Sequence, residues 1–179
     1  MRHPADAASS PVEKPADQGV LIVGIDPGTG ITGFGVVRRE HGGSISLVEC
    51  GVIRTSPGEP LPKRIREIFL EVDALLERHR PFAVSVEDVF QGKNVRSALT
   101  LGHARGAILL AAALRDLPIH EYTPRAIKKA VVGTGNATKD QVGFMVMQQL
   151  KLRSAPSPAD AADGVAVALA HCLMGSFPR

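Results

Sequence analysis

The hydrophobic positions predict three β-strands at the start of the folded part of the chain. The segments rich in aliphatic and β-branched residues are 21–25, 33–38 and 45–55. Short runs of this kind, separated by turn residues, are typical of strands rather than helices. His41, Gly42 and Gly43 join the last two segments, so we expect three adjacent strands.

After residue 60 the spacing becomes that of helices alternating with short strands. Apolar residues recur at positions 61, 65, 68, 69, 72, 75 and 76, the spacing of one helical face, and Pro81 ends this helix. The remaining predicted elements are a strand at 82–86, a helix at 97–114, a strand at 118–122, and helices at 124–132, 138–152 and 157 to about 173. For the last helix we expect Ser157 as N-cap and Pro158 at the first helical position. This order predicts an α/β fold, a mixed five-stranded sheet flanked by helices on both faces.

The length of 179 residues indicates one domain. Residues 1–18 are rich in Ala, Pro, Ser and charge and are predicted to be a flexible N-terminal extension, which leaves 19–179 as the folded domain. The longest apolar run, 106–114, is about half the length of a membrane-spanning helix. Cys50 and Cys172 match no metal-binding spacing, so we interpret both as small buried hydrophobic residues and expect a cytoplasmic protein.

The positive charge of the chain is concentrated in one window. The whole chain carries a net charge of +3, whereas the window from 91 to 139 holds eight basic and two acidic residues, a local surplus of +6. A solvated helical face would explain a lone basic stretch. The sharper interpretation is a polyanionic partner rich in phosphate.

Four acidic residues occupy positions where active sites of α/β proteins are commonly found. Asp26 ends the first predicted strand, and Glu87 holds the same place after the fourth. Ligands of such sheets bind beyond the carboxyl ends of the central strands. Asp160 and Asp163 are three residues apart in the first turns of the last helix and therefore share a face. Taken singly, each acid could instead be a turn residue or a partner of the helix dipole.

Together these acids predict a site for a hard cation. Clustered carboxylates would repel one another unless a divalent ion neutralised them. The chain lacks clustered His or Cys ligands for a softer metal, and oxygen ligands alone suit Mg²⁺.

The glycine-rich turn after the first strand has two nucleotide-binding interpretations, and we reject both. Gly28, Gly30 and Gly33 form a literal GxGxxG pattern, but a dinucleotide fold requires a helix next, whereas 34–38 is predicted to be extended. The segment 26–29 also resembles the phosphate loop of actin-like and sugar-kinase ATPases. Those enzymes close two such domains on the nucleotide, and this chain supplies only one.

Six segments, in order, resemble the signature segments of the RuvC family of bacterial Holliday-junction resolvases. They are 24–36, 86–94, 98–106, 121–128, 132–139 and 159–164. The resemblance covers residues 20 to about 175. It implies an RNase H-like nuclease domain acting as a crossover junction endodeoxyribonuclease, a Mg²⁺-dependent hydrolase that makes paired symmetric nicks in four-way DNA junctions during recombination and repair.

The resemblance also implies roles for individual residues. Asp26, Glu87, Asp160 and Asp163 correspond to the metal-binding acids, which would hold two Mg²⁺ ions per site, with Mn²⁺ able to substitute. Lys128 and Lys139 match the site lysines, although the adjacent Lys129 leaves the first choice open. Phe90 matches an aromatic residue placed against the junction's bases. The further predicted DNA contacts are Lys93, Asn94, Arg96 and Arg105.

The resemblance further implies a homodimer and, as a partner, a branch-migration complex of RuvA and RuvB. Residues 98–114 are the candidate contributor to the dimer interface, and the alternative for them is burial in the monomer's own core. A twofold dimer would present two identical sites to the two opposed strands of the junction. Two alternatives are an RNase H-like nuclease acting on RNA and a junction-binding protein without catalysis. The polar loop around Phe90 and the long basic window argue against the first, and the intact acids argue against the second.

Overall fold

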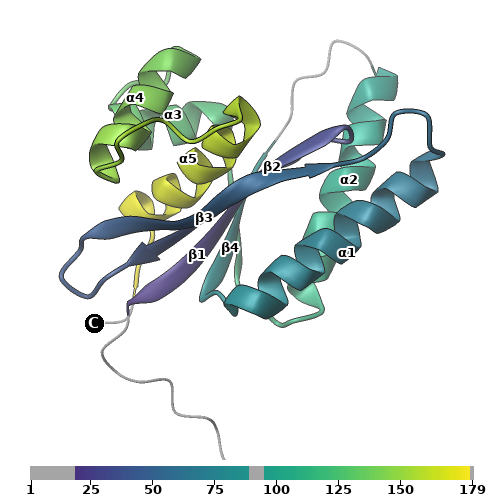
Figure 1. The fold of residues 1–179 in the computed structure, drawn as a ribbon, viewed down its shortest axis with the longest axis horizontal. Helices are drawn as coiled ribbons and strands as arrows, with labels where there is room; N and C mark the ends of the chain where they lie inside the picture. Colours follow the sequence, from purple (N-terminus) through teal and green to yellow (C-terminus); the bar gives the residue numbers. More distant parts are fainter. Residues whose placement is uncertain (1–18, 89–94, 178–179) are drawn as a thin grey trace, which may run out of the picture.

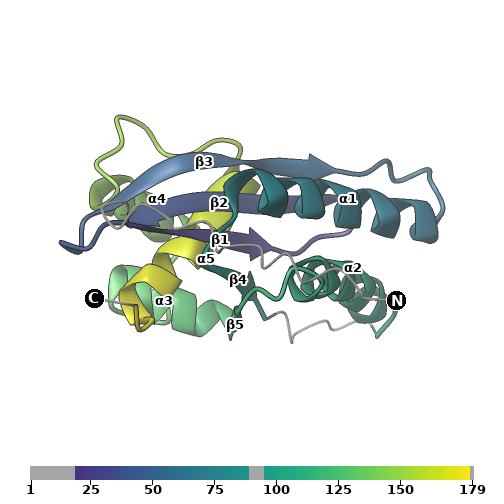
Figure 2. The same cartoon turned by 90° about the horizontal axis from the view of Figure 1, so that it is seen from below.

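A five-stranded mixed sheet forms the centre of the computed structural model, which describes residues 19–88 and 95–177 (Figure 1). The strands are β1 (Val20–Asp26), β2 (Ile31–Arg39), β3 (Ile45–Arg54), β4 (Ala83–Glu87) and β5 (Ile119–Tyr122). Their order in the sheet is β3-β2-β1-β4-β5, which Figure 2 shows from one side. β1, β2 and β3 pair antiparallel, whereas β4 runs parallel to β1 and to β5. The predicted adjacent strands and the mixed sheet are confirmed.

Helices cover both faces of the sheet, as predicted. They are α1 (Leu61–His79), α2 (Val95–Ala113), α3 (Pro124–Val132), α4 (Lys139–Gln149) and α5 (Ala159–Met174). One apolar core joins α1 and α2 to one sheet face, and a second joins α3, α4 and α5 to the other. In Figure 1 the two groups lie on opposite sides of the sheet. A strand alternates its side chains between these two cores, and this alternation decides which face each strand-end acid occupies.

Glycines let α5 lie directly on the sheet. A Cβ atom added to Gly33 would overlap the carbonyl oxygen of Asp160, and one added to Gly164 would lie 2.5 Å from Cα of Phe34. Gly24 and Gly35 meet the backbone of α5 in the same way. Since any larger side chain would push the helix outward, these glycines explain why the acidic first turns of α5 lie against the ends of β1 and β2.

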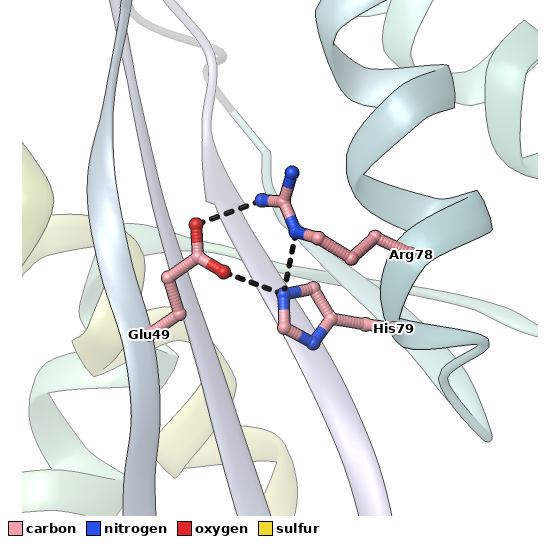
Figure 3. A network of polar contacts seen from close by, with 3 residues as sticks. All are labelled: Glu49, Arg78 and His79. Carbon is pink, nitrogen blue, oxygen red and sulfur yellow. Dashed lines mark hydrogen bonds and ion pairs between the residues drawn. The ribbon is translucent and has the colours of Figure 1, made fainter.

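On the opposite face, a polar contact fixes the end of α1 to β3 (Figure 3). Glu49 accepts from Arg78 at 2.8 Å through Oε1, and its Oε2 lies 2.6 Å from Nε2 of His79. A carboxylate oxygen can only accept, so at 2.6 Å Nε2 of His79 must carry the proton and donate to Glu49; it then cannot also accept from Arg78 Nε at 3.4 Å. The His79–Glu49 hydrogen bond holds α1 over the antiparallel half of the sheet.

Three sequence-based details are wrong. The N-cap of α5 is Pro158, without a side-chain hydrogen bond, because Pro158 has an extended ψ of 178° and the helix begins at Ala159. Cys50 is only partly buried because its strand, β3, lies at one edge of the sheet, whereas Cys172 is buried as expected. His103 is exposed on α2, although its place in an apolar helical segment favours a core position, while His171 is buried.

The predicted extension at 1–18 lies outside the described residues. Within the described part of the chain, no helix is both long enough and apolar enough to cross a bilayer.

Candidate active site

Asp26 and Glu87 are neighbours at the carboxyl ends of two parallel strands. Ile25 of β1 pairs with Val86 of β4, so the next residue of each strand is an acid. Ile25 and Val86 both belong to the core beneath α1 and α2, and strand alternation therefore turns both acids toward the α5 face. Asp26 and Glu87, which were predicted separately from the sequence, thus lie side by side.

The turn after Asp26 is held by buried hydrogen bonds. The hydroxyl of Thr32, which is fully buried, donates to the carbonyl oxygen of Gly28 at 2.7 Å. Arg64 of α1 donates to the carbonyl oxygen of Thr29 and, at 3.0 Å, to the hydroxyl of Thr55. These contacts fix the chain where it leaves β1, and with it the direction of Asp26.

Asp163 joins this pair in a cavity of about 300 Å³. The cavity is lined by Asp26, Pro27, Glu87, Pro124, Ile127, Lys128, Lys139, Val142, Asp163 and Ala166. Asp160, one turn earlier on α5, is not among the lining residues, although its charge still raises the pKa of Lys139. The structure therefore brings three of the four predicted acids to one cavity and leaves the fourth at its margin.

Crowding of the acids changes their protonation. Burial, the charge of Glu87, a hydrogen bond with Glu87 and the charge of Asp163 together raise the pKa of Asp26 to about 8. Burial also raises the pKa of Glu87, and Asp163 adds to the effect. At neutral pH this half-buried pair therefore retains a proton unless a cation takes its place.

Lys139 compensates Asp163. It is the first residue of α4, and its Nζ donates to Oδ2 of Asp163 at 2.8 Å. This hydrogen bond and the charge of Asp163 raise the pKa of Lys139, which stays cationic. A capping box between Thr138 and Gln141 fixes the start of α4 and so the base of this lysine.

Lys128, rather than Lys129, faces the cavity. Lys128 lines it and its charge lowers the pKa of Glu87, whereas Lys129 is exposed and not among the lining residues. The hydroxyl of Thr123 caps α3 by accepting from the backbone of Ala126. Because Ile127 is buried in the core, its neighbour Lys128 stands at the edge of the helix that borders the cavity.

Sequence reasoning missed the apolar walls of the cavity. Ile127, Val142 and Ala166 bring α3, α4 and α5 together around the acids. Their burial follows from helical spacing, but nothing local in the sequence shows that three helices converge at one place.

The donor set fits a hard divalent cation. Asp26, Glu87 and Asp163 offer only carboxylate oxygens, and a cation would offset the burial and the repulsion that raise the pKa values of the first two. In residues 19–88 and 95–177, however, no three acidic, histidine or cysteine side chains already surround a single metal position. With Lys139 engaged on Asp163, the acids line the cavity without closing on one centre.

The predicted DNA contacts have different outcomes. Phe90, Lys93 and Asn94 lie outside the described residues. Arg96 is exposed in the first turn of α2. Arg105 forms ion pairs with Glu121 and, at 3.5 Å, with Asp88, so a phosphate would have to compete with two carboxylates.

Comparisons with known proteins agree with this geometry. Residues 22–171 match the family model described as "Crossover junction endodeoxyribonuclease RuvC". Proteins of that name are 49% identical in Pelotomaculum thermopropionicum, over 89% of this chain and 97% of the relative, and 46% identical in Brevibacillus brevis, over 87% and 93%.

Solved structures give the same result. A structure described as "T. thermophilus RuvC in complex with Holliday junction substrate" superposes with a TM-score of 0.82 and 38% identity, covering 86% of this chain and 93% of that one. The yeast mitochondrial Holliday junction resolvase Ydc2, 13% identical, shares the fold with a TM-score of 0.64, covering 88% and 80%.

Proposed function

This chain belongs to the RuvC family of crossover junction endodeoxyribonucleases, and from that premise we propose that Asp26, Glu87, Asp160 and Asp163 hold the divalent cations with which it cuts DNA. Its function is that of the family, resolution of four-way Holliday junctions. The observation that carries the residue assignment is the half-buried Asp26–Glu87 pair, with Asp163 in the same cavity. Mg²⁺ is the proposed ion, two per site, with Mn²⁺ able to substitute. Asp160 would complete the ligand set from the margin of the cavity.

The residues around the ions would have distinct roles in cleavage. Bound divalent ions would supply an activated water and stabilise the leaving oxygen of the cleaved phosphodiester. Lys139, released from Asp163 when a cation neutralises that acid, would contact the phosphate oxygens. Lys128 adds positive charge from the opposite helix.

The basic window supports binding to the DNA backbone. Lys129 and Arg125 are exposed on α3 beside the cavity, so the positive potential extends beyond the site itself. Such phosphate contacts weaken steeply as salt displaces them. Phe90, Lys93, Asn94, Arg96 and Arg105 remain proposed DNA contacts; Phe90 would stack on an unpaired base.

We propose that α2 forms the homodimer interface. The more than half-exposed apolar side chains on and directly after this helix are Val95, Leu99, Leu110 and Leu114. Positions 95, 99, 106 and 110 fall on one helical face, and Gly106 there has open space beyond it. A twofold contact through this face would place two sites on a substrate that itself has twofold symmetry. Docking of a RuvA and RuvB complex and a cytoplasmic location are further proposals from the family resemblance.

A cleavage assay tests the proposed function. A labelled four-way junction, a linear duplex and an RNA hairpin are each incubated with the protein, with and without Mg²⁺. We expect symmetric nicks on the junction alone and only with the ion. Cleavage of the RNA hairpin would favour the RNA-processing alternative, and binding without nicks would favour the non-catalytic one.

A further inference from the structure

A second cavity adjoins the catalytic one and has no role in the mechanism above. Its volume is about 290 Å³, and its lining residues are Lys139, Asp140, Val142, Gly143, Phe144, Ala155, Pro156, Ala159, Ala162 and Asp163. Lys139, Val142 and Asp163 line both cavities, so the two adjoin and share a wall. A strand that occupies the first therefore passes next to the second.

Phe144 gives this cavity its character. It is an aromatic residue on α4 with 56% of its surface exposed, although a side chain of this kind is normally buried. Gly143 beside it has open space where a side chain would stand. The facing wall, from the segment before α5 and its first turn, consists of Pro156 and small alanines. An aromatic face opposite small residues leaves room for a flat ring.

The charges around the cavity favour entry of a base rather than of a phosphate. Asp140 and Asp163 would repel a phosphate, whereas Lys139 at the shared wall attracts one. Lys139 and Phe144 are five residues apart on one helix, about 7.5 Å along its axis. That rise is about two steps of 3.4 Å, the spacing of one strand's charges along the axis of a DNA duplex. Since both side chains line the same cavity, a phosphate at Lys139 leaves a base one or two nucleotides away within reach of Phe144.

We infer that this cavity is a nucleotide subsite in which Phe144 stacks on a base close to the cut phosphate, on the same strand. The inference rests on the proposed function, because it takes the strand in the catalytic cavity as its starting point. Because stacking strength differs among bases, Phe144 would contribute to the choice of cleavage position.

The experiment combines protein variants with abasic substrates. Single-turnover cleavage rates are measured for the wild type, Phe144→Ala and Phe144→Tyr on junctions with one abasic residue at each position within three nucleotides of the cut. Leu70→Ala is the matched control, because Leu70 is another exposed apolar side chain but lies on α1, across the sheet. Gly143→Leu, which places a side chain in the open space, is the blocking variant.

We expect Phe144→Ala to cleave the intact junction about tenfold more slowly, as loss of one stacked base predicts. Phe144→Tyr and Leu70→Ala should stay near the wild-type rate, and Gly143→Leu should be slow while keeping its melting temperature. At one position the abasic residue should slow cleavage by the wild type about as much as Phe144→Ala slows cleavage of the intact junction. At that position Phe144→Ala should cut the abasic junction no more slowly than the intact one. Such coupling at a single position would not arise if the substitution merely displaced Lys139.

Three results would overturn the inference. One is an unchanged rate for Phe144→Ala, and another is an equal slowing of both proteins at every abasic position. The third is a change in oligomeric state of Phe144→Ala in sedimentation, which would identify the cavity as a contact between copies of the chain. If the wild type fails to cut the intact junction, the proposed function fails instead.

Discussion

The carboxyl group of Asp26 connects folding stability to the chemistry of the site. In the unfolded chain it would ionise near its ordinary pKa, 3.8, whereas in the folded protein burial beside Glu87 raises the pKa to about 8. Because the folded state binds the extra proton, the stabilising contribution is present at low pH and is lost as pH rises between these two values. A divalent cation should replace the proton and restore that stability.

The Asp26→Asn variant tests this account, since it removes the charge and keeps the shape. In EDTA at about pH 8 we expect its free energy of unfolding to exceed that of the wild type by roughly 1–3 kcal/mol, after allowance for partial exposure. Mg²⁺ should raise the melting temperature of the wild type more than that of the variant.

Asp73→Asn serves as the control, because a hydrogen bond from Arg115 holds the pKa of Asp73 below its usual value. Asp73→Asn should therefore lower the free energy of unfolding, whereas Asp26→Asn should raise it. A wild type indifferent to both pH and Mg²⁺ would contradict the account.

The buried side chain of His171 should make the free energy of unfolding depend on pH in the acid range. Burial and the nearby His120 lower the pKa of His171 to about 4, and Nδ1 of His171 lies 2.7 Å from the hydroxyl of Tyr122. The unfolded state takes up a proton first as pH falls below about 6.5, so this contribution to stability is lost toward the folded pKa.

We expect the free energy of unfolding to fall by roughly 1–2 kcal/mol from this group between about pH 7.5 and pH 5. His171→Gln should flatten that part of the curve, measured by urea unfolding at a series of pH values. Substitution of the exposed His41 by Gln is the comparison that should leave the slope unchanged. Equal slopes in all three proteins would argue against a buried neutral His171.

At the scale of elements, the contact between α5 and the sheet decides whether the acids meet. Gly33 pairs with Asp26 across β1 and β2 and lies beneath the carbonyl oxygen of Asp160. The helix that carries two acids therefore rests directly on the strand residue beside the first acid.

Gly33→Ala should destabilise the protein by about 1–3 kcal/mol, because the added methyl group overlaps the backbone of α5. Under conditions where the variant is still folded, junction cleavage should also fall, since Asp163 moves with its helix. Gly42→Ala, at a turn position with nothing within 4 Å of the added atom, should change neither quantity. The measurements are chemical unfolding and the cleavage rate, and a Gly33→Ala protein as active and as stable as the wild type would refute the role given to this contact.

The elements themselves could be predicted from hydrophobic spacing, and the site only in part. α3 begins and ends as predicted because Thr123 and Pro124 mark its start in the local sequence. The predicted start of α5 is wrong because Pro158 has an extended ψ, so the helix begins one residue later, at Ala159. The strand-end positions of Asp26 and Glu87 follow from local pattern, but Asp160 outside the cavity and Lys128 inside it depend on how whole helices pack. Such packing is not visible in the spacing of single residues.

At the scale of the whole molecule, the proposed dimer relates the exposed face of α2 to paired cutting. Leu99→Asp should disrupt it, because a charge buried at the centre of an apolar contact is strongly unfavourable. We expect sedimentation to show monomers and the junction to receive single, uncoordinated nicks. Leu70→Asp makes the same change on α1 and should leave a dimer with paired nicks. If Leu99→Asp sediments and cuts like the wild type, the interface lies elsewhere.

The central claim is that clustered carboxylates in an otherwise basic protein hold the ions that cut DNA. The most direct test measures binding and cleavage of one four-way junction by Asp26→Asn and the wild type in Mg²⁺. The account predicts similar dissociation constants, because no positive charge is removed, and cleavage slower by at least about a hundredfold for the variant. Paired nicks made by Asp26→Asn at the wild-type rate would contradict it.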